Sequence, residues 1–256
     1  MIRQPLRTCV NCHLKGACGQ AQRATAACLA LLLTTAAPAF ADEPQRVEVD
    51  PLRWQADIDA ILQADAEQPP APGGVLFVGS SSIRMWQTAE SFPELAVINR
   101  GFGGSQASDV NRFVEQLVLK YAPRAIVFYA GDNDIADGQP PSIVADDFQT
   151  FAERVYEALP DTRIIYISIK PSIARWQMWP AMAEANELIR AYCDGHEQLT
   201  FLDIAPTLLG EDGQPRPEQF VEDGLHLSEQ GYAAWTEWLT EQLKAPDAQH
   251  GDGHDH

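Results

Sequence analysis

Val75-Leu76-Phe77-Val78-Gly79-Ser80-Ser81-Ser82 is the stretch that decides the fold, because a continuous apolar run ends abruptly in glycine and serine. Four more apolar runs of similar length follow it, each bounded by turn residues. The five predicted strands cover residues 75–78, 96–98, 125–129, 164–169 and 199–202. Strands that are apolar along their whole length are buried on both faces, which is typical of a parallel sheet.

Stretches with helical periodicity alternate with these strands. The predicted helices cover residues 52–66, 108–121, 142–159, 182–193 and 228–243. Strands that alternate with helices, joined by right-handed crossovers, predict a doubly wound α/β domain with helices on both faces of the sheet. We predict one such domain over residues 42–245 and a disordered polar tail over residues 246–256.

The first 41 residues have the composition of an export signal. They contain four basic residues and no acidic one, and an apolar run over residues 26–33 precedes Ala39-Phe40-Ala41, a small-x-small cleavage pattern. This predicts a signal peptide over residues 1–41 and a mature protein in the periplasm or outside the cell. The apolar run is short for a membrane span, so we expect no stable membrane anchor.

The charge balance limits the choice of partners. The 256-residue chain has a formal net charge of -18, and without the predicted signal it keeps 14 basic and 36 acidic side chains, a net charge of -22. Such a surface repels polyanions, so we predict no nucleic-acid partner and favour a small neutral ester as substrate. The sequence gives no indication of the oligomeric state.

Ligands of doubly wound sheets bind beyond the carboxyl ends of the strands, so the loops that leave each strand matter most. A serine in the first such loop, at Ser80, Ser81 or Ser82, is either a nucleophile or a helix cap, and the residues alone do not choose among the three. The second loop, residues 99–105, contains three glycines, which suit a tight turn or a backbone that approaches a ligand.

The third loop is Gly131-Asp132-Asn133-Asp134. The carboxamide of Asn133 could donate a hydrogen bond to an oxyanion, and an Asx turn is the alternative. A calcium-loop frame fails, because Ala136 and Ile143 occupy positions that need oxygen ligands. We predict no metal site and no organic cofactor.

Only two histidines, His196 and His226, lie outside the predicted signal and tail. His196 precedes the fifth strand and therefore belongs to the opposite edge of the sheet. His226 follows the last strand, and Asp223 lies three residues before it. This spacing lets the carboxylate orient the imidazole as a general base, although a helix-capping aspartate is the alternative.

Together, the blocks Gly79-Ser80-Ser81-Ser82, Gly103-Gly104, Gly131-Asp132-Asn133 and Asp223-Gly224-Leu225-His226 resemble those of the SGNH hydrolases, or GDSL-type lipases and esterases, over roughly residues 75–243. The resemblance implies a flavodoxin-like three-layer α/β/α sandwich whose five-stranded parallel sheet has the order 2-1-3-4-5. It also implies ester hydrolysis through a serine acyl-enzyme.

The resemblance assigns a role to each site residue. Ser81 would be the nucleophile, His226 the general base and Asp223 the carboxylate that orients it. The oxyanion hole would consist of the backbone N–H groups of Ser81 and Gly104 and the side chain of Asn133. One departure concerns the first block, where Ser80 replaces the aspartate that this family usually has before its serine, a position outside the catalytic triad.

The substrate is the least determined feature. Trp176 and Trp179, in the loop after the fourth strand, could line a substrate pocket or pack against the following helix. Short-chain acyl esters, acetylated sugars and lysophospholipids all fit a secreted serine esterase. The alternatives are an O-acyltransferase that uses a carbohydrate acceptor and a non-catalytic carbohydrate- or lipid-binding protein on the same fold.

Overall fold

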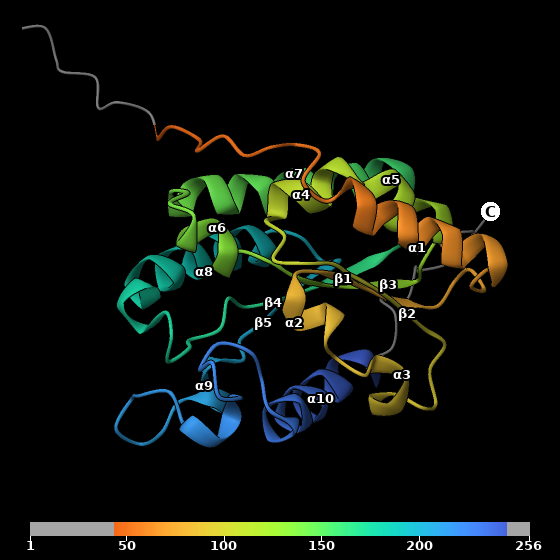
Figure 1. Ribbon diagram of the computed structural model, residues 1–256. Helices are drawn as coiled ribbons and strands as arrows, with labels where there is room; N and C mark the ends of the chain where they lie inside the picture. The colour runs from red at the N-terminus through yellow and green to blue at the C-terminus, as the bar shows by residue number, and fades with distance from the viewer. Residues whose placement is uncertain (1–43, 245–256) are drawn as a thin grey trace, which may run out of the picture. The chain divides into compact units, whose positions relative to one another are not determined.

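The computed structural model describes residues 44–244, and the predicted signal peptide and polar tail lie outside these described residues. Their centre is a five-stranded parallel sheet in the order β2-β1-β3-β4-β5 (Figure 1). In chain order the strands are β1 (Val75–Gly79), β2 (Val97–Gly101), β3 (Ala125–Tyr129), β4 (Arg163–Ile167) and β5 (Leu199–Leu202). The predicted strand order is confirmed.

Helices cover both faces of this sheet (Figure 1). One face carries α1 (Gln55–Glu67), α4 (Ala107–Arg112), α5 (Val114–Leu117), α7 (Pro141–Ala158) and α8 (Trp179–Asp194). The other carries α2 (Ser81–Arg84), α3 (Thr88–Ser91), α9 (Ala205–Leu208) and α10 (Glu229–Lys244). A further short helix, α6 (Asp132–Ala136), follows β3. The predicted three-layer α/β/α sandwich is therefore confirmed.

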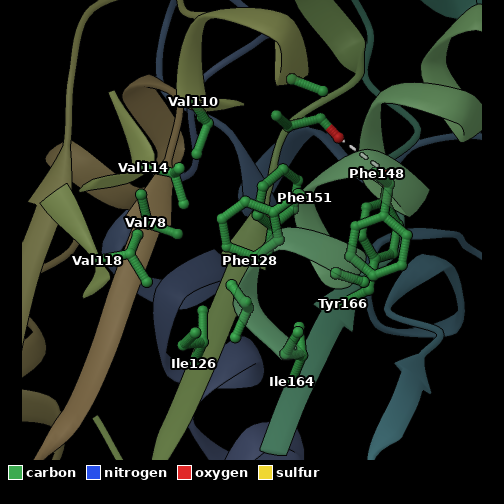
Figure 2. Close-up of a cluster of buried hydrophobic side chains, with 14 of the residues drawn as sticks. Val78, Val110, Val114, Val118, Ile126, Phe128, Phe148, Phe151, Ile164 and Tyr166 are labelled. Carbon is green, nitrogen blue, oxygen red and sulfur yellow. Dashed lines mark hydrogen bonds between the residues drawn. The ribbon is translucent and has the colours of Figure 1, made fainter. Parts of the chain in front are cut away.

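Strand side chains alternate between two cores, as the two-residue period of a strand requires. On β1, Leu76 and Val78 belong to the core under α4, α5 and α7, and Phe77 belongs to the core under α3 and α10. Figure 2 shows the first core, where Phe128 packs against Phe151 with ring centroids 4.6 Å apart. Burying a large apolar side chain contributes about 1.5–3 kcal/mol, so these cores hold the strand ends in place.

Strand β2 is longer than the prediction, which ended it at residue 98. Asn99 and Arg100 continue the strand, pairing with Phe77 and Val78 of β1. Polar residues are tolerated there because tertiary partners satisfy them. The Asn99 carboxamide donates to the carbonyl groups of Ile83 and Trp86, at 2.8 and 3.1 Å.

The helix predicted over residues 108–121 is broken into α4, α5 and the 3₁₀ turn η1 (Leu119–Tyr121). The carbonyl of Asn111 accepts a hydrogen bond from Arg154 of α7, and its side chain donates to the Asp147 carbonyl at 2.7 Å. These tertiary bonds stabilise a bend at Phe113, whose backbone leaves the helical region. The apolar periodicity of the segment survives, because all three pieces pack on the same core.

Two short helices lie at strand ends where the sequence predicted loops. The helix α2 begins directly after β1, and α6 begins after the turn that follows β3. Both are at the carboxyl edge of the sheet, where they position serine and asparagine side chains. No helix among residues 44–244 has the length and apolar character needed to cross a membrane.

Candidate active site

The turn between β1 and α2 selects one of the three serines. Gly79 has φ +137°, and a β-carbon there would lie 1.8 Å from the Tyr129 carbonyl oxygen, so only glycine fits. Ser80 and Ser82 are 0% and 1% exposed, whereas Ser81 is partly exposed at the first position of α2. Of the three hydroxyl groups, that of Ser81 is therefore the accessible one.

The imidazole of His226 lies between Ser81 and Asp223. Its Nε2 is 3.0 Å from Oγ of Ser81, and its Nδ1 is 2.6 Å from Oδ2 of Asp223. The other carboxylate oxygen of Asp223 accepts the backbone N–H groups of Leu225 and His226, at 2.8 and 2.9 Å. The structure thus brings together three side chains that lie up to 145 residues apart in the sequence.

Asp223 is held as a carboxylate. Desolvation raises its pKa, but the hydrogen bonds from the His226 ring and from two backbone N–H groups together outweigh this effect and lower the pKa to about 2. An ionised carboxylate can only accept a hydrogen bond, so Nδ1 of His226 carries the proton and donates a hydrogen bond to Asp223. The unprotonated Nε2 then faces Ser81 as a hydrogen-bond acceptor. This is the tautomer that a general base requires.

The loop before His226 is fixed to the loop after β4. Gly224 has φ +63°, and its carbonyl accepts the N–H of Ala174 at 3.0 Å. The N–H of Val221 donates to the carbonyl of His226 at 2.9 Å. These backbone bonds hold the histidine at the carboxyl edge although no strand supports it.

Gly104 and Asn133, from two different loops, are neighbours. A β-carbon placed on Gly104 would lie 3.7 Å from Oδ1 and 3.8 Å from Nδ2 of Asn133. The two loops are joined by Asp134, whose carboxylate oxygen accepts the N–H of Ala107 at 3.0 Å. Complete burial raises the pKa of Asp134 to about 8, despite the backbone hydrogen bonds that favour its ionised form.

A buried ionic cluster under the site did not figure in the sequence predictions. Nζ of Lys170 lies 2.9 Å from Oδ2 of Asp132 and donates to the hydroxyl groups of Tyr129 and Ser82, at 3.0 and 3.2 Å. Arg175 lies 3.2 Å from the same carboxylate oxygen. Burial raises the pKa of Asp132, but the charges of Lys170 and Arg175 outweigh it and hold the pKa below its usual value. The available signal is a pair of basic residues, Lys170 and Arg175, in the loop that follows an apolar strand.

Replacing Lys170 with methionine should lower the free energy of unfolding by about 3 kcal/mol, because it removes one partner of a buried ion pair and leaves two hydroxyl groups without their donor. Urea denaturation measures this loss. Lys120→Met is the matched control, since Lys120 pairs with Asp65 at 2.7 Å but is 35% exposed. It should cost less than about 1 kcal/mol. Equal losses in the two variants would contradict the prediction.

Trp176 and Trp179 stack on each other, with ring centroids 6.2 Å apart and an angle of 10° between the rings. Trp179 also packs against the core beneath α8, which agrees with the packing alternative for that residue. His196 lies in the turn before β5, at the opposite edge of the sheet, with Nδ1 2.8 Å from the Tyr192 carbonyl. Among the described residues, no group of three or more His, Cys, Asp or Glu side chains is arranged to hold a metal ion.

A parallel α/β sandwich in which a serine is hydrogen-bonded to a histidine, and the histidine to a carboxylate, is typical of serine hydrolases. The chain belongs to the GDSL-like lipase/acylhydrolase family, whose profile matches residues 79–234. The resemblance found in the sequence is confirmed, and the protein is a hydrolase that acts on ester bonds.

Similar proteins include the platelet-activating factor acetylhydrolase IB subunit alpha1 of Pongo abelii, 29% identical over 190 residues, or 71% of this chain and 78% of the relative. The Homo sapiens protein is 29% identical over 189 residues, with 70% and 78% coverage. A GDSL-like lipase from Bacteroides thetaiotaomicron has a TM-score of 0.62 at 20% identity, covering 73% of this chain and 97% of that one. A carbohydrate esterase family 3 structure from Talaromyces cellulolyticus has a TM-score of 0.55 at 16% identity, with 66% and 95% coverage. At these identities the two structures show a shared fold.

Proposed function

We propose that this protein is an exported serine esterase that hydrolyses carboxylic esters through an acyl-enzyme on Ser81. The proposal depends on one observation, the hydrogen-bonded line from Oγ of Ser81 through the ring of His226 to Asp223. His226 takes the serine proton as Ser81 attacks the ester carbonyl, and then gives it to the leaving alcohol. In the second half, His226 takes a proton from the water that attacks the acyl-enzyme, and it returns this proton to Oγ of Ser81 as the acyl–oxygen bond breaks and the acid leaves.

The negative charge of the tetrahedral intermediate needs donors that are in place before the reaction. The backbone N–H of Ser81 is suited to this role, because the first N–H groups of a helix have no acceptor within the helix. The N–H of Gly104 and the carboxamide of Asn133 are the two further donors in the proposal. The closeness of Gly104 and Asn133 supports it, since donors that come together from separate loops are the usual form of an oxyanion hole.

For the substrate we propose a small neutral ester with a short acyl group, such as acetyl. The names of the similar proteins, a platelet-activating factor acetylhydrolase subunit and a carbohydrate esterase, support a choice within this class. A groove of about 710 Å³ runs between α2, α3 and α10 and offers room for the alcohol part. Its lining includes Met85, one turn after Ser81, and Leu227, directly after His226.

Export to the periplasm or the extracellular space is part of the same proposal. The N-terminal composition of residues 1–41 supports it. The charge of -22 on the remaining chain disfavours anionic partners such as nucleic acid. The reaction as proposed needs neither a metal nor an organic cofactor.

A fluorophosphonate probe tests the proposed function, because it phosphonylates only a serine activated by a base. After labelling and proteolysis, mass spectrometry should find the probe on Ser81 and not on Ser80 or Ser82. Denaturation before labelling should abolish the modification, because the activation depends on the fold. An unlabelled native protein, or a label on another residue, would refute the assignment.

A further inference from the structure

We infer that Arg175 is a positioning residue that fixes the orientation of the Asn133 carboxamide. The inference rests on the proposed function, in which Asn133 donates to the oxyanion, and adds to it a residue from a different loop. Arg175 belongs to the segment between β4 and α8, whereas Asn133 lies in α6 after β3.

The contact between the two side chains has a defined polarity. The guanidinium of Arg175 donates to Oδ1 of Asn133 at 3.0 Å. A guanidinium has five N–H donors and no acceptor, so it can bind only the oxygen end of the carboxamide. The nitrogen end must therefore point away from Arg175.

The nitrogen end is fixed as well. Nδ2 of Asn133 donates one hydrogen to the carbonyl of Ser105 at 3.1 Å. A carboxamide nitrogen carries two hydrogens, so the second remains available for another acceptor. The carboxamide lies beside Gly104, where a β-carbon would be 3.8 Å from Nδ2. With a donor at one end and an acceptor at the other, rotation of the amide by 180° would break both bonds.

The position of Arg175 itself is set by Asp132. A nitrogen of the guanidinium lies 3.2 Å from Oδ2 of Asp132, and the arginine side chain is only 18% exposed. Lys170 already supplies a counter-charge to this carboxylate at 2.9 Å. Neutralising Asp132 therefore does not by itself explain why Arg175 is there. A role in orienting the neighbouring Asn133 does explain it.

Loss of Arg175 would leave Oδ1 of Asn133 without its donor and allow the amide to turn its oxygen toward the developing negative charge. Arg175→Ala is expected to lower kcat on p-nitrophenyl acetate by between about 10- and 100-fold, with KM changed by less than about threefold. Arg175→Lys should restore part of the rate, because an ammonium group can donate to Oδ1 but lacks the planar fork.

The decisive test is a double-mutant cycle between Arg175→Ala and Asn133→Ala. If Arg175 acts through Asn133, its removal should change kcat by less than about twofold in the Asn133→Ala background. Asn133→Ala alone should lower kcat by about 10²–10³-fold. Arg190→Ala is the matched control, since Arg190 follows the same strand but pairs with Asp203 at 3.2 Å, and its loss should leave kcat unchanged.

Losses that multiply in the double variant would overturn the inference, as would a change confined to KM. If Arg175→Ala does not fold, the same cycle with Arg175→Lys decides the question. The two hypotheses fail separately. An unlabelled Ser81 refutes the proposed function, whereas independent effects in an enzyme that still labels refute only the role of Arg175.

Discussion

Replacing Ser81 with alanine is expected to lower kcat for p-nitrophenyl acetate by about 10⁶-fold, the cost found when a serine nucleophile of this kind is removed. Without its oxygen no acyl-enzyme can form, and His226 has no hydroxyl to deprotonate. The fold should be unaffected, because Ser81 is partly exposed and α2 retains its other residues. Steady-state kinetics and a thermal melt of the same sample measure both effects.

The control for this variant is its neighbour. Oγ of Ser80 is buried and has no hydrogen-bond partner among the described residues. Ser80→Ala should therefore keep kcat within about threefold of the unmodified enzyme, because the substitution breaks no hydrogen bond and removes only one oxygen atom. A protein that hydrolyses the ester equally well without Ser81, or that loses activity without Ser80 instead, would show that the nucleophile is misassigned.

The parts of the fold that the sequence predicted well are those determined by local pattern. The strands at residues 125–129 and 199–202 match β3 and β5 residue for residue, because each is an apolar run bounded by turns. Strand β2 was cut short because Arg100 is unlike a strand residue in isolation. Its partners Asp65 and Tyr121 come from segments 35 and 21 residues away, which no local pattern contains.

The candidate site divides in the same way. The turn at Gly79, the asparagine after β3 and the Asp223–His226 spacing are local signals, so a sequence search finds them. The pairing of Arg175 with Asn133 depends on how two loops from neighbouring strands pack at the sheet edge. That packing follows from the strand order, in which β3 and β4 are adjacent, and from side-chain rotamers that the sequence does not specify.

Asp223→Asn is expected to lower kcat by about 10⁴-fold with little change in KM, the cost seen when a triad carboxylate of another hydrolase becomes an amide. The substituted side chain would keep Oδ1 on the backbone N–H groups of Leu225 and His226, so the loop should remain intact. Its NH₂ group would donate to Nδ1 of His226, and the proton would then sit on Nε2, facing Ser81. In that tautomer His226 cannot accept the serine proton.

The pH dependence of this deficit follows from the pKa of Asp223. The folded-state pKa is about 2, below the ordinary value of 3.8. Above pH 3.8 the Asp223 side chain is therefore ionised and orients His226, and it loses this role only as the pH falls toward 2. The deficit of Asp223→Asn should therefore persist at every pH above 3.8. Asp212→Asn is the matched control, because Asp212 makes a similar turn bond to the N–H of Gln214 at 3.0 Å without a histidine partner. If the Asp223→Asn enzyme kept a tenth or more of its kcat, the carboxylate would only stabilise the turn, and the general base would have to be oriented by another group.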